Sequence, residues 1–167
     1  MRLGIIARCD DTGLGNQTLE LTNMLNPDKV LVIDSSPFHK GHRQFPERYK
    51  GRQCIFSHGI PSNSDIGRFL RDLDVVISCE TFYHQEFIKF ANLRNVKTIL
   101  QYNFEFLEYM TNDKKMLPTA LIAPSLWRFS EVKTKFQDRT YVDFLPPPTN
   151  RSEEHTSELQ SHSFISY

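Results

Sequence analysis

Apolar and polar positions alternate along residues 1–150 in a pattern that predicts strands and helices in turn. Continuous apolar runs of four to six residues are typical of short strands that are buried on both faces. Such runs occupy residues 3–7, 29–34, 54–57, 74–79, 96–100, 120–123 and 141–145. Three consecutive prolines, Pro146 to Pro148, follow the last run and end it.

Helical periodicity appears between these runs. Leu14, Leu21, Met24 and Leu25 share one helical face, which predicts a helix from about residue 14 to residue 25. Asn26-Pro27 would end that helix. Further helices are predicted near residues 62–73, 83–91, 104–110 and 125–136, and the polar stretch 35–52 is predicted to be a long loop.

Short strands that alternate with helices predict an α/β fold. Right-handed crossovers then give a Rossmann-like, doubly wound parallel sheet with helices on both faces. Ligands of such sheets bind beyond the carboxyl ends of the strands. The loops of interest are therefore residues 8–16, 34–36, 57–63, 79–83, 101–105 and 124–127.

The alternation stops at Arg151. Residues 151–167 hold Ser or Thr at six positions and have almost no apolar periodicity, which predicts a disordered tail. The segment RSEEHTSELQS, with ISY at the end, resembles a frame translation of a common sequencing adapter. We therefore interpret residues 1–150 as the natural domain and residues 151–167 as a non-native tail. This interpretation implies that the gene is cut near Asn150, where a longer protein would continue.

Composition narrows the possible functions. The chain has 20 basic and 20 acidic residues. Without the tail residues Arg151, Glu153, Glu154 and Glu158, 19 basic and 17 acidic residues remain. This near balance of charge gives no basis for a nucleic-acid partner. No apolar run approaches the length of a membrane span, and the N-terminus becomes charged too early for a secretory signal. Three cysteines without metal spacing predict small buried side chains, no metal site and a reducing, cytoplasmic location.

The loop of residues 8–16, the first of the loops at the predicted carboxyl edge, contains a short glycine pattern. Gly13, Leu14, Gly15 and Asn16 join the first strand to the first helix, where glycines would let backbone N–H groups approach a phosphate. The pattern lacks the third glycine of the dinucleotide fingerprint and the Gly-Lys-Ser/Thr of a P-loop. A tight turn without a ligand is the alternative interpretation.

Polar side chains follow three later strands. Glu80 and Glu105 could act as a general base or bind sugar hydroxyls, and Asn103 offers a bidentate amide. The alternative for these residues is helix capping. Ser125 is interpreted as a helix cap and Trp127 as a core residue rather than a sugar-stacking platform. His58 follows the third strand, and a lone histidine is more often a surface or packed residue than a catalyst.

The ordered set of segments resembles a known family. GIIARCDDTGLGNQT, DVVISCETFY, VKTILQYNFEFLEY, ALIAPSLW and VDFLPPPTN together resemble the N-terminal half of a GT-B glycosyltransferase of the group 1, RfaB-like kind, found in bacteria and phages. The resemblance covers most of residues 1–150. It implies a domain that holds the acceptor and faces a second Rossmann-like domain across a cleft.

The resemblance also implies roles for individual residues. The donor is a nucleotide sugar, a co-substrate rather than a cofactor, and its diphosphate would approach the segment from Gly13 to Asn16. Glu80 and Glu105 are the candidate catalytic carboxylates. The acceptor, a glycan or another molecule, would contact the remaining polar residues, which are Thr81, Asn103, Ser125 and His58. The C-terminal domain would carry the nucleotide pocket, so residues 1–150 alone are expected to be inactive.

Two alternatives stay open. Gly-Leu-Gly-Asn-Gln is also similar to the opening of α-1,2-fucosyltransferases, whose basic His-x-Arg-Arg type motif does not occur here. A Rossmann-like binding module without chemistry is the other alternative. A second domain downstream in the source genome would favour the transferase.

Overall fold

The structure, a computed structural model, describes residues 1–105, 107 and 116–147. The predicted tail, residue Pro148 and most of the predicted helix 104–110 lie outside the described residues. Among the described residues, no helix combines the length and the apolar character needed to cross a bilayer.

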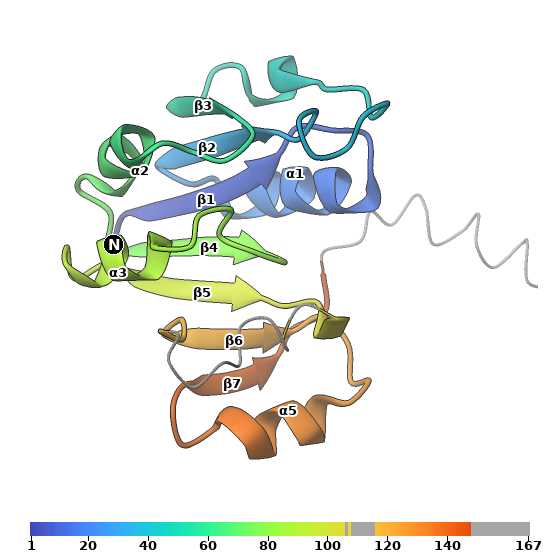
Figure 1. The fold of residues 1–167 in the computed structure, drawn as a ribbon, viewed down its shortest axis with the longest axis vertical. Helices are drawn as coiled ribbons and strands as arrows, with labels where there is room; N and C mark the ends of the chain where they lie inside the picture. Colours follow the sequence, from blue (N-terminus) through green and yellow to red (C-terminus); the bar gives the residue numbers. More distant parts are fainter. Residues whose placement is uncertain (106, 108–115, 148–167) are drawn as a thin grey trace, which may run out of the picture.

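Seven parallel strands form one sheet, as the apolar runs predict (Figure 1). The strands are β1 (Leu3–Arg8), β2 (Lys29–Asp34), β3 (Cys54–His58), β4 (Val75–Cys79), β5 (Lys97–Gln101), β6 (Ala120–Ala123) and β7 (Tyr141–Phe144). Their order in the sheet is β3-β2-β1-β4-β5-β6-β7, and every neighbouring pair is parallel. The predicted Rossmann-like α/β class is therefore confirmed.

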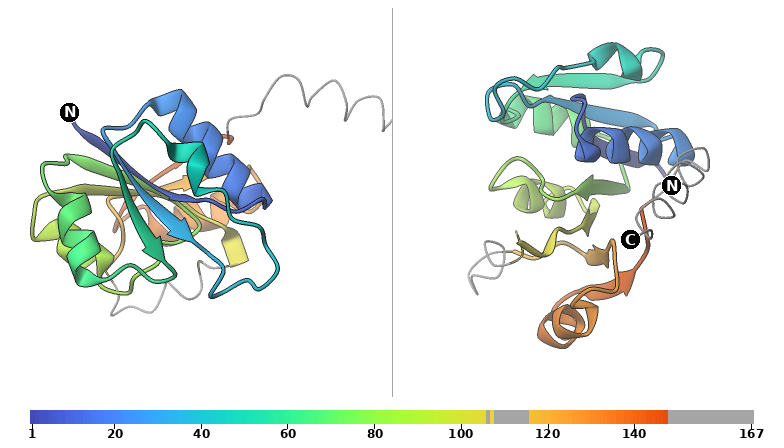
Figure 2. Two further views of the ribbon diagram at one scale, coloured as in Figure 1. Left: turned by 90° about the horizontal axis from the view of Figure 1, so that it is seen from above. Right: turned by 90° about the vertical axis from the view of Figure 1, so that its right-hand side faces the viewer.

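Helices cover the two faces of the sheet unequally (Figure 2). The helix α1 (Gly13–Leu25) packs on one face, where Leu21 joins the buried side chains of β1 and β2. The helices α2 (Asn63–Leu70), α3 (Phe87–Asn92) and α5 (Phe129–Phe136) contribute to a larger core on the other face. A short 3-10 helix, η1 (Pro46–Tyr49), lies within the long loop after β2.

Alternation along each strand divides its side chains between these two cores. In β1, Ile6 faces the larger core, whereas Ile5 and Ala7 face α1. The α1 side is less well covered over β5–β7. There Ile99 and Ile122 are only half-buried, and Tyr141 is 63% exposed. No described helix packs on that part of the sheet.

Two helices begin later than the periodicity predicts. Tyr83 lies before α3 rather than within it, because its positive φ of 59° cannot continue a helix and its N–H bonds to Thr81 Oγ1 at 3.2 Å. Helix α5 begins at Phe129, because Arg128 also has a positive φ, 54°. The segment from Ser125 to Trp127 is therefore a loop at the carboxyl edge of the sheet.

Candidate functional site

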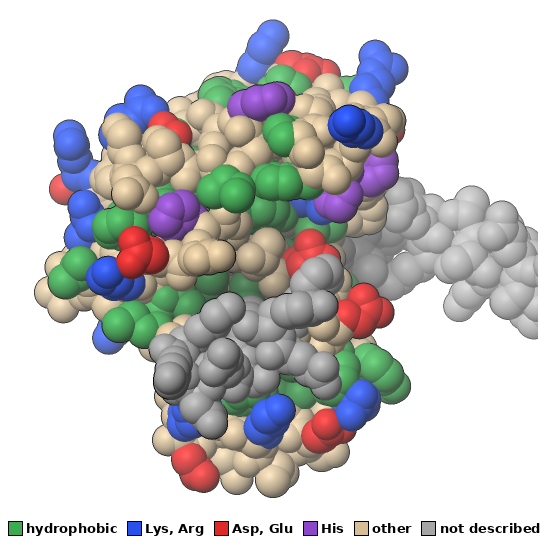
Figure 3. Space-filling view, in the orientation of Figure 1, with side chains coloured by type: hydrophobic (Ala, Val, Ile, Leu, Met, Phe, Trp, Pro, Cys, Tyr) green, Lys and Arg blue, Asp and Glu red, His purple; other side chains and the backbone are tan. Residues whose placement is uncertain are grey.

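The direction of the chain reverses between β1 and β4. From β1 the chain continues through β2 to β3 on one side, and from β4 it continues through β5 and β6 to β7 on the other side. Loops that leave β1 and β4 therefore run apart. Ligands of doubly wound sheets bind between two such loops, and the region between these two is called the crevice. In Figure 3, the edge toward which the strands point carries histidine and carboxylate side chains together.

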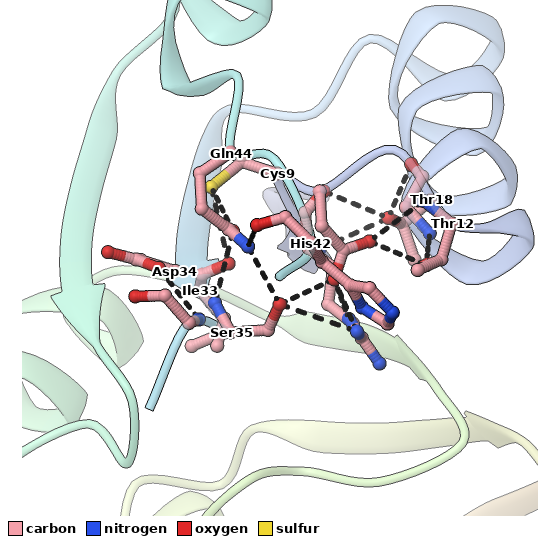
Figure 4. Close-up of polar contacts among 12 residues, drawn as sticks. Cys9, Thr12, Thr18, Ile33, Asp34, Ser35, His42 and Gln44 are labelled. Atoms are coloured by element: carbon pink, nitrogen blue, oxygen red, sulfur yellow. Dashed lines mark hydrogen bonds and ion pairs between the residues drawn. The ribbon is translucent and has the colours of Figure 1, made fainter. Parts of the chain in front are cut away.

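Arg8 and Asp10 form a buried ion pair on the β1 side of the crevice, next to Thr12 and Ser35, which Figure 4 labels. Asp10 is fully buried, and its carboxylate accepts hydrogen bonds from Arg8 Nε at 2.7 Å, Ser35 Oγ at 2.5 Å and Thr12 Oγ1 at 2.5 Å. Burial alone would raise the pKa of Asp10, but these hydrogen bonds and the Arg8 charge lower it. Asp10 is therefore ionised and already paired.

The long loop after β2 folds back over the ion pair. Gln44 forms an isolated antiparallel bridge with Asp10, and its side-chain oxygen accepts from the Ser35 N–H at 3.2 Å. The buried hydroxyl of Tyr49 donates to the carbonyl of Arg8 at 2.8 Å. Sequence reasoning missed this network, although Arg8 at the end of β1 and Asp10 just after it could have drawn attention to it.

The glycine pattern forms the first turn of α1 and not a separate loop. Neither Gly13 nor Gly15 has a positive φ. Gly15 is required for another reason, since a Cβ there would lie 2.2 Å from the Asp10 carbonyl oxygen. Thr12 Oγ1 accepts a hydrogen bond from the N–H of Gly15 at 3.2 Å. The Thr12 carbonyl accepts one from the N–H of Asn16 at 2.9 Å. Among the described residues, nothing hydrogen-bonds to the N–H groups of Gly13 and Leu14.

Glu80 stands at the β4 side of the same crevice. Its carboxylate accepts from Asn103 Nδ2 at 3.2 Å and lies 4.0 Å from Arg8 Nη1, with 19% of the side chain exposed. Its N–H donates to the Gln101 carbonyl at 2.7 Å, which extends the pairing of β4 with β5 by one residue. Glu80 is thus a partly exposed carboxylate fixed at both its backbone and its side chain.

Backbone strain concentrates at this edge. Among the described residues, six non-glycine residues have positive φ. Three of them are Asn26, Asp72 and Asn95, in turns that precede strands, and short Asn and Asp side chains tolerate this conformation. The other three are Glu80, Tyr83 and Arg128, which follow β4 or β6 and for which it is costly. Costly conformations of this kind cluster at functional sites.

A small pocket adjoins Glu80. It has a volume of about 130 Å³ and is lined by Tyr102, Asn103, Phe104, Glu105, Pro124, Ser125 and Trp127. The structure thus brings Asn103, Glu105 and Ser125 together, and Asn103 links them to Glu80.

Two expectations about the pocket residues are wrong. Trp127 is 63% exposed rather than part of the core, because the late start of α5 leaves it on the loop. Ser125 does not cap α5, whose N-cap is Arg128. Its hydroxyl instead accepts from the N–H of Trp127 at 3.3 Å, within that loop.

His58 and Thr81 do not join this group. His58 ends β3 and contacts Asp34 through Nδ1 at 2.7 Å. Two strands, β2 and β1, separate β3 from β4, so His58 lies on the opposite side of the crevice from the pocket. Thr81 shapes the loop after β4, since its carbonyl accepts from the Ser78 hydroxyl at 2.5 Å.

The cysteines near the crevice are buried or half-buried. Burial raises the pKa of Cys9 to about 11 and that of Cys79 to about 12, so both thiols stay protonated at neutral pH. Cys54 is half-buried. In the part of the chain that the structure describes, no three His, Cys, Asp or Glu side chains gather in a way that could hold a metal ion.

Two tyrosine hydroxyls near the crevice are buried without a partner among the described residues. They belong to Tyr83 and Tyr102, which follow β4 and β5. Buried polar groups almost always have a hydrogen-bond partner, so each such exception requires an explanation. Tyr102 also lines the pocket.

Comparisons of the chain with protein-family models, curated proteins and solved structures found no match.

Proposed function

We propose that residues 1–150 form the acceptor-side domain of a GT-B glycosyltransferase that takes its donor from a nucleotide sugar. The observation that carries this proposal is the position of Glu80. Its carboxylate lies at the reversal point of a doubly wound sheet, is held at 3.2 Å by Asn103, and adjoins a pocket with further polar side chains. The resemblance of the sequence to group 1 transferases supports the same assignment.

The geometry suits activation of an acceptor hydroxyl. Asn103 donates to Glu80 Oε1 and so fixes the carboxylate, which leaves the remaining lone pairs available to accept the proton of an acceptor hydroxyl. Arg8 Nη1 lies 4.0 Å from Oε2 and places a positive charge beside the carboxylate. In this proposal, Glu80 is the base or the hydroxyl ligand, and Asn103 orients it.

The donor would approach from the first turn of α1. The N–H groups of Gly13 and Leu14 have no partner among the described residues and lie at a helix N-terminus, which favours phosphate oxygens. The Asp10 carboxylate beneath this turn would repel a phosphate, but Arg8 pairs with it. A second Rossmann-like domain would supply the remaining donor contacts, because two N–H groups cannot hold a nucleotide sugar alone.

The test is to express the reading frame from the source genome with whatever follows residue 150 and to measure nucleotide release with a panel of donors and acceptors. If Glu80 is the base, Glu80→Gln should lower kcat by about 10²- to 10⁴-fold. If Glu105 only binds acceptor hydroxyls, Glu105→Gln should mainly raise KM for the acceptor.

Glu47→Gln provides the matched control, because Glu47 is an exposed carboxylate in η1, outside the crevice. It should leave both constants unchanged. Full activity of Glu80→Gln would refute the role of Glu80. Binding of sugars without any transfer would instead favour the non-catalytic module.

A further inference from the structure

The pocket beside Glu80 combines an aromatic wall with a polar rim. Phe104 and Trp127 meet edge to face, with ring centroids 5.1 Å apart and planes at 71°. Asn103, Glu105 and Ser125 surround them with an amide, a carboxylate and a hydroxyl. An apolar ring face next to hydrogen-bonding groups matches a molecule that has C–H groups on its faces and hydroxyls around its rim.

Arg128 holds the aromatic wall in place. Its guanidinium carbon lies 3.9 Å from the Phe104 ring centroid, and its nitrogens bind Glu131 through two hydrogen bonds of 2.7 and 2.8 Å. Arg128 therefore covers Phe104. It also lies over the Trp127 ring, 5.7 Å from the centroid, but Trp127 still keeps 63% of its surface exposed. An ordered, exposed indole costs little conformational entropy when it binds a ligand.

Tyr102 lines the pocket as a residue of the larger core. Tyr102 is 3% exposed and lines the pocket, yet its hydroxyl has no partner among the described residues. The hydroxyl is inaccessible and the side chain packs in the larger core, so Tyr102 contributes to the packing of the pocket and not to its hydrogen-bonding rim.

Size and charge narrow the class of ligand. A volume of 130 Å³ is smaller than the roughly 300–1,000 Å³ of pockets that enclose drug-sized ligands, so the pocket suits one ring rather than a nucleotide. Glu105 in the polar rim and Glu80, which lies beyond Asn103, would repel a phosphate or a carboxylate. A neutral polyol ring fits both conditions.

We propose that this pocket binds one neutral pyranose ring, stacked on Trp127, with its hydroxyls paired to Asn103 and Glu105. This deepens the proposed function, on which it rests for its role. The ring would be the sugar unit of the acceptor that places a hydroxyl next to Glu80, so the acceptor would be a glycan or glycoside. The binding itself requires no donor and no second domain.

Trp127 is the only tryptophan of the chain, so its fluorescence reports on this pocket alone. The full 167-residue chain is titrated with the methyl glycosides of glucose, galactose, mannose and N-acetylglucosamine, and with uridine and adenosine. At least one glycoside should change the emission saturably, with a Kd of about 1–10 mM, the affinity expected for roughly a dozen ligand atoms. No saturable change with any glycoside up to 100 mM, or saturation by a nucleoside instead, would overturn the proposal.

Calorimetry on variants tests the contacts one at a time. Trp127→Ala should weaken glycoside binding about tenfold or more, and Trp127→Phe should retain most of it. Glu105→Ala should weaken binding about fivefold to tenfold without lowering the midpoint of unfolding, because Glu105 is exposed, and a purely structural role would not produce this combination.

Phe56→Ala is the matched control. Phe56 is also an exposed aromatic residue, 55% exposed, but lies on the edge strand β3. Its removal should leave glycoside binding unchanged. Glycoside binding without sugar transfer by the extended protein would refute the proposed function but not the pocket. Transfer with no response of Trp127 would refute the pocket alone.

Discussion

Very close contacts restrict which side chains can occupy individual positions at the carboxyl edge of the sheet. The Asp10 carboxylate accepts hydrogen bonds from three side chains, and Gly15 packs against the Asp10 carbonyl, so the surroundings of Asp10 tolerate little change. The two tyrosines Tyr49 and Tyr102 are both buried, but only Tyr49 has a hydrogen-bond partner for its hydroxyl among the described residues. Substituting Tyr49 and Tyr102 in the same way can separate the effect of packing on stability from the effect of hydrogen bonding.

The two glycines of α1 should respond oppositely to alanine. Gly15→Ala should lower the free energy of unfolding by about 1–3 kcal/mol, because the new Cβ would lie 2.2 Å from the Asp10 carbonyl oxygen. Gly13→Ala should raise it by about 0.4–1 kcal/mol, because nothing lies within 4 Å and alanine favours the helix. Urea unfolding measures both, and equal effects of the two substitutions would contradict the close packing at Gly15.

The two tyrosines should also respond oppositely. Tyr49→Phe should lower the free energy of unfolding by about 1 kcal/mol or more, because the buried Arg8 carbonyl loses its 2.8 Å hydrogen bond. Tyr102→Phe should raise it by up to about 1 kcal/mol, because the lost hydroxyl has no partner among the described residues. Thermal unfolding of both variants is the measurement. A loss of stability in Tyr102→Phe would show that its hydroxyl is already satisfied.

At the scale of elements, α2 begins at a complete capping box. Ser62 Oγ accepts from the Asp65 N–H at 3.1 Å, and the Asp65 carboxylate accepts from the Ser62 N–H at 3.1 Å. The hydrogen bonds from Ser62, followed by that from Arg68, lower the pKa of Asp65. Helices α3 and α5 lack a side-chain cap, and both begin later than their apolar periodicity.

Asp65→Asn should therefore have a pH-dependent effect. A lowered pKa in the folded state means that ionised Asp65 stabilises the fold above the ordinary carboxyl pKa, and this contribution is lost as the pH falls through the folded-state value. The variant should lose about 0.5–2 kcal/mol at pH 7. This difference should shrink below about pH 4.

Chemical unfolding between pH 2.5 and pH 7 tests the effect at Asp65. Ser64→Ala is the control, since Ser64 is exposed in the same turn and takes no part in the capping box. A loss of stability in Asp65→Asn that stays constant over this pH range would show that the charge of Asp65 does not contribute to it.

At the scale of the whole molecule, the cover of the sheet is uneven. Strand β1 has neighbours on both sides and core on both faces, with Ile5 and Ile6 at most 1% exposed. Strand β7 is an edge strand whose Tyr141 and Asp143 are exposed on the α1 side. Stability should therefore decrease across the sheet from β1 toward β7.

Hydrogen exchange should show this gradient. The amides of β1, β2 and β4 should exchange most slowly, and those of β7 should exchange faster by on the order of 100-fold, because local opening of an edge strand exposes little apolar surface. Exchange measured by mass spectrometry at neutral pH resolves the strands. Equal protection of β7 and β1 would indicate that the sheet opens only as one unit.

The sequence by itself determined the sheet. Apolar runs such as Val30–Ile33 can be satisfied only where both faces are buried, and alternation with helices leaves parallel pairing with right-handed crossovers as the solution. The positions of Glu80 and Asn103 at the same edge follow from that topology, since each comes just after its strand.

Only the tertiary structure decided which side chains meet at that edge. The pairing of Arg8 with Asp10 and Ser35, the return of Gln44 over them, and the exposure of Trp127 depend on loop conformations and on positive φ values at Glu80, Tyr83 and Arg128. Local propensity disfavours such backbone conformations, and distant contacts stabilise them, so no periodic pattern records them. The glycine at position 15 is the clearest case, because its spacing resembles a phosphate loop while its necessity comes from the carbonyl of Asp10.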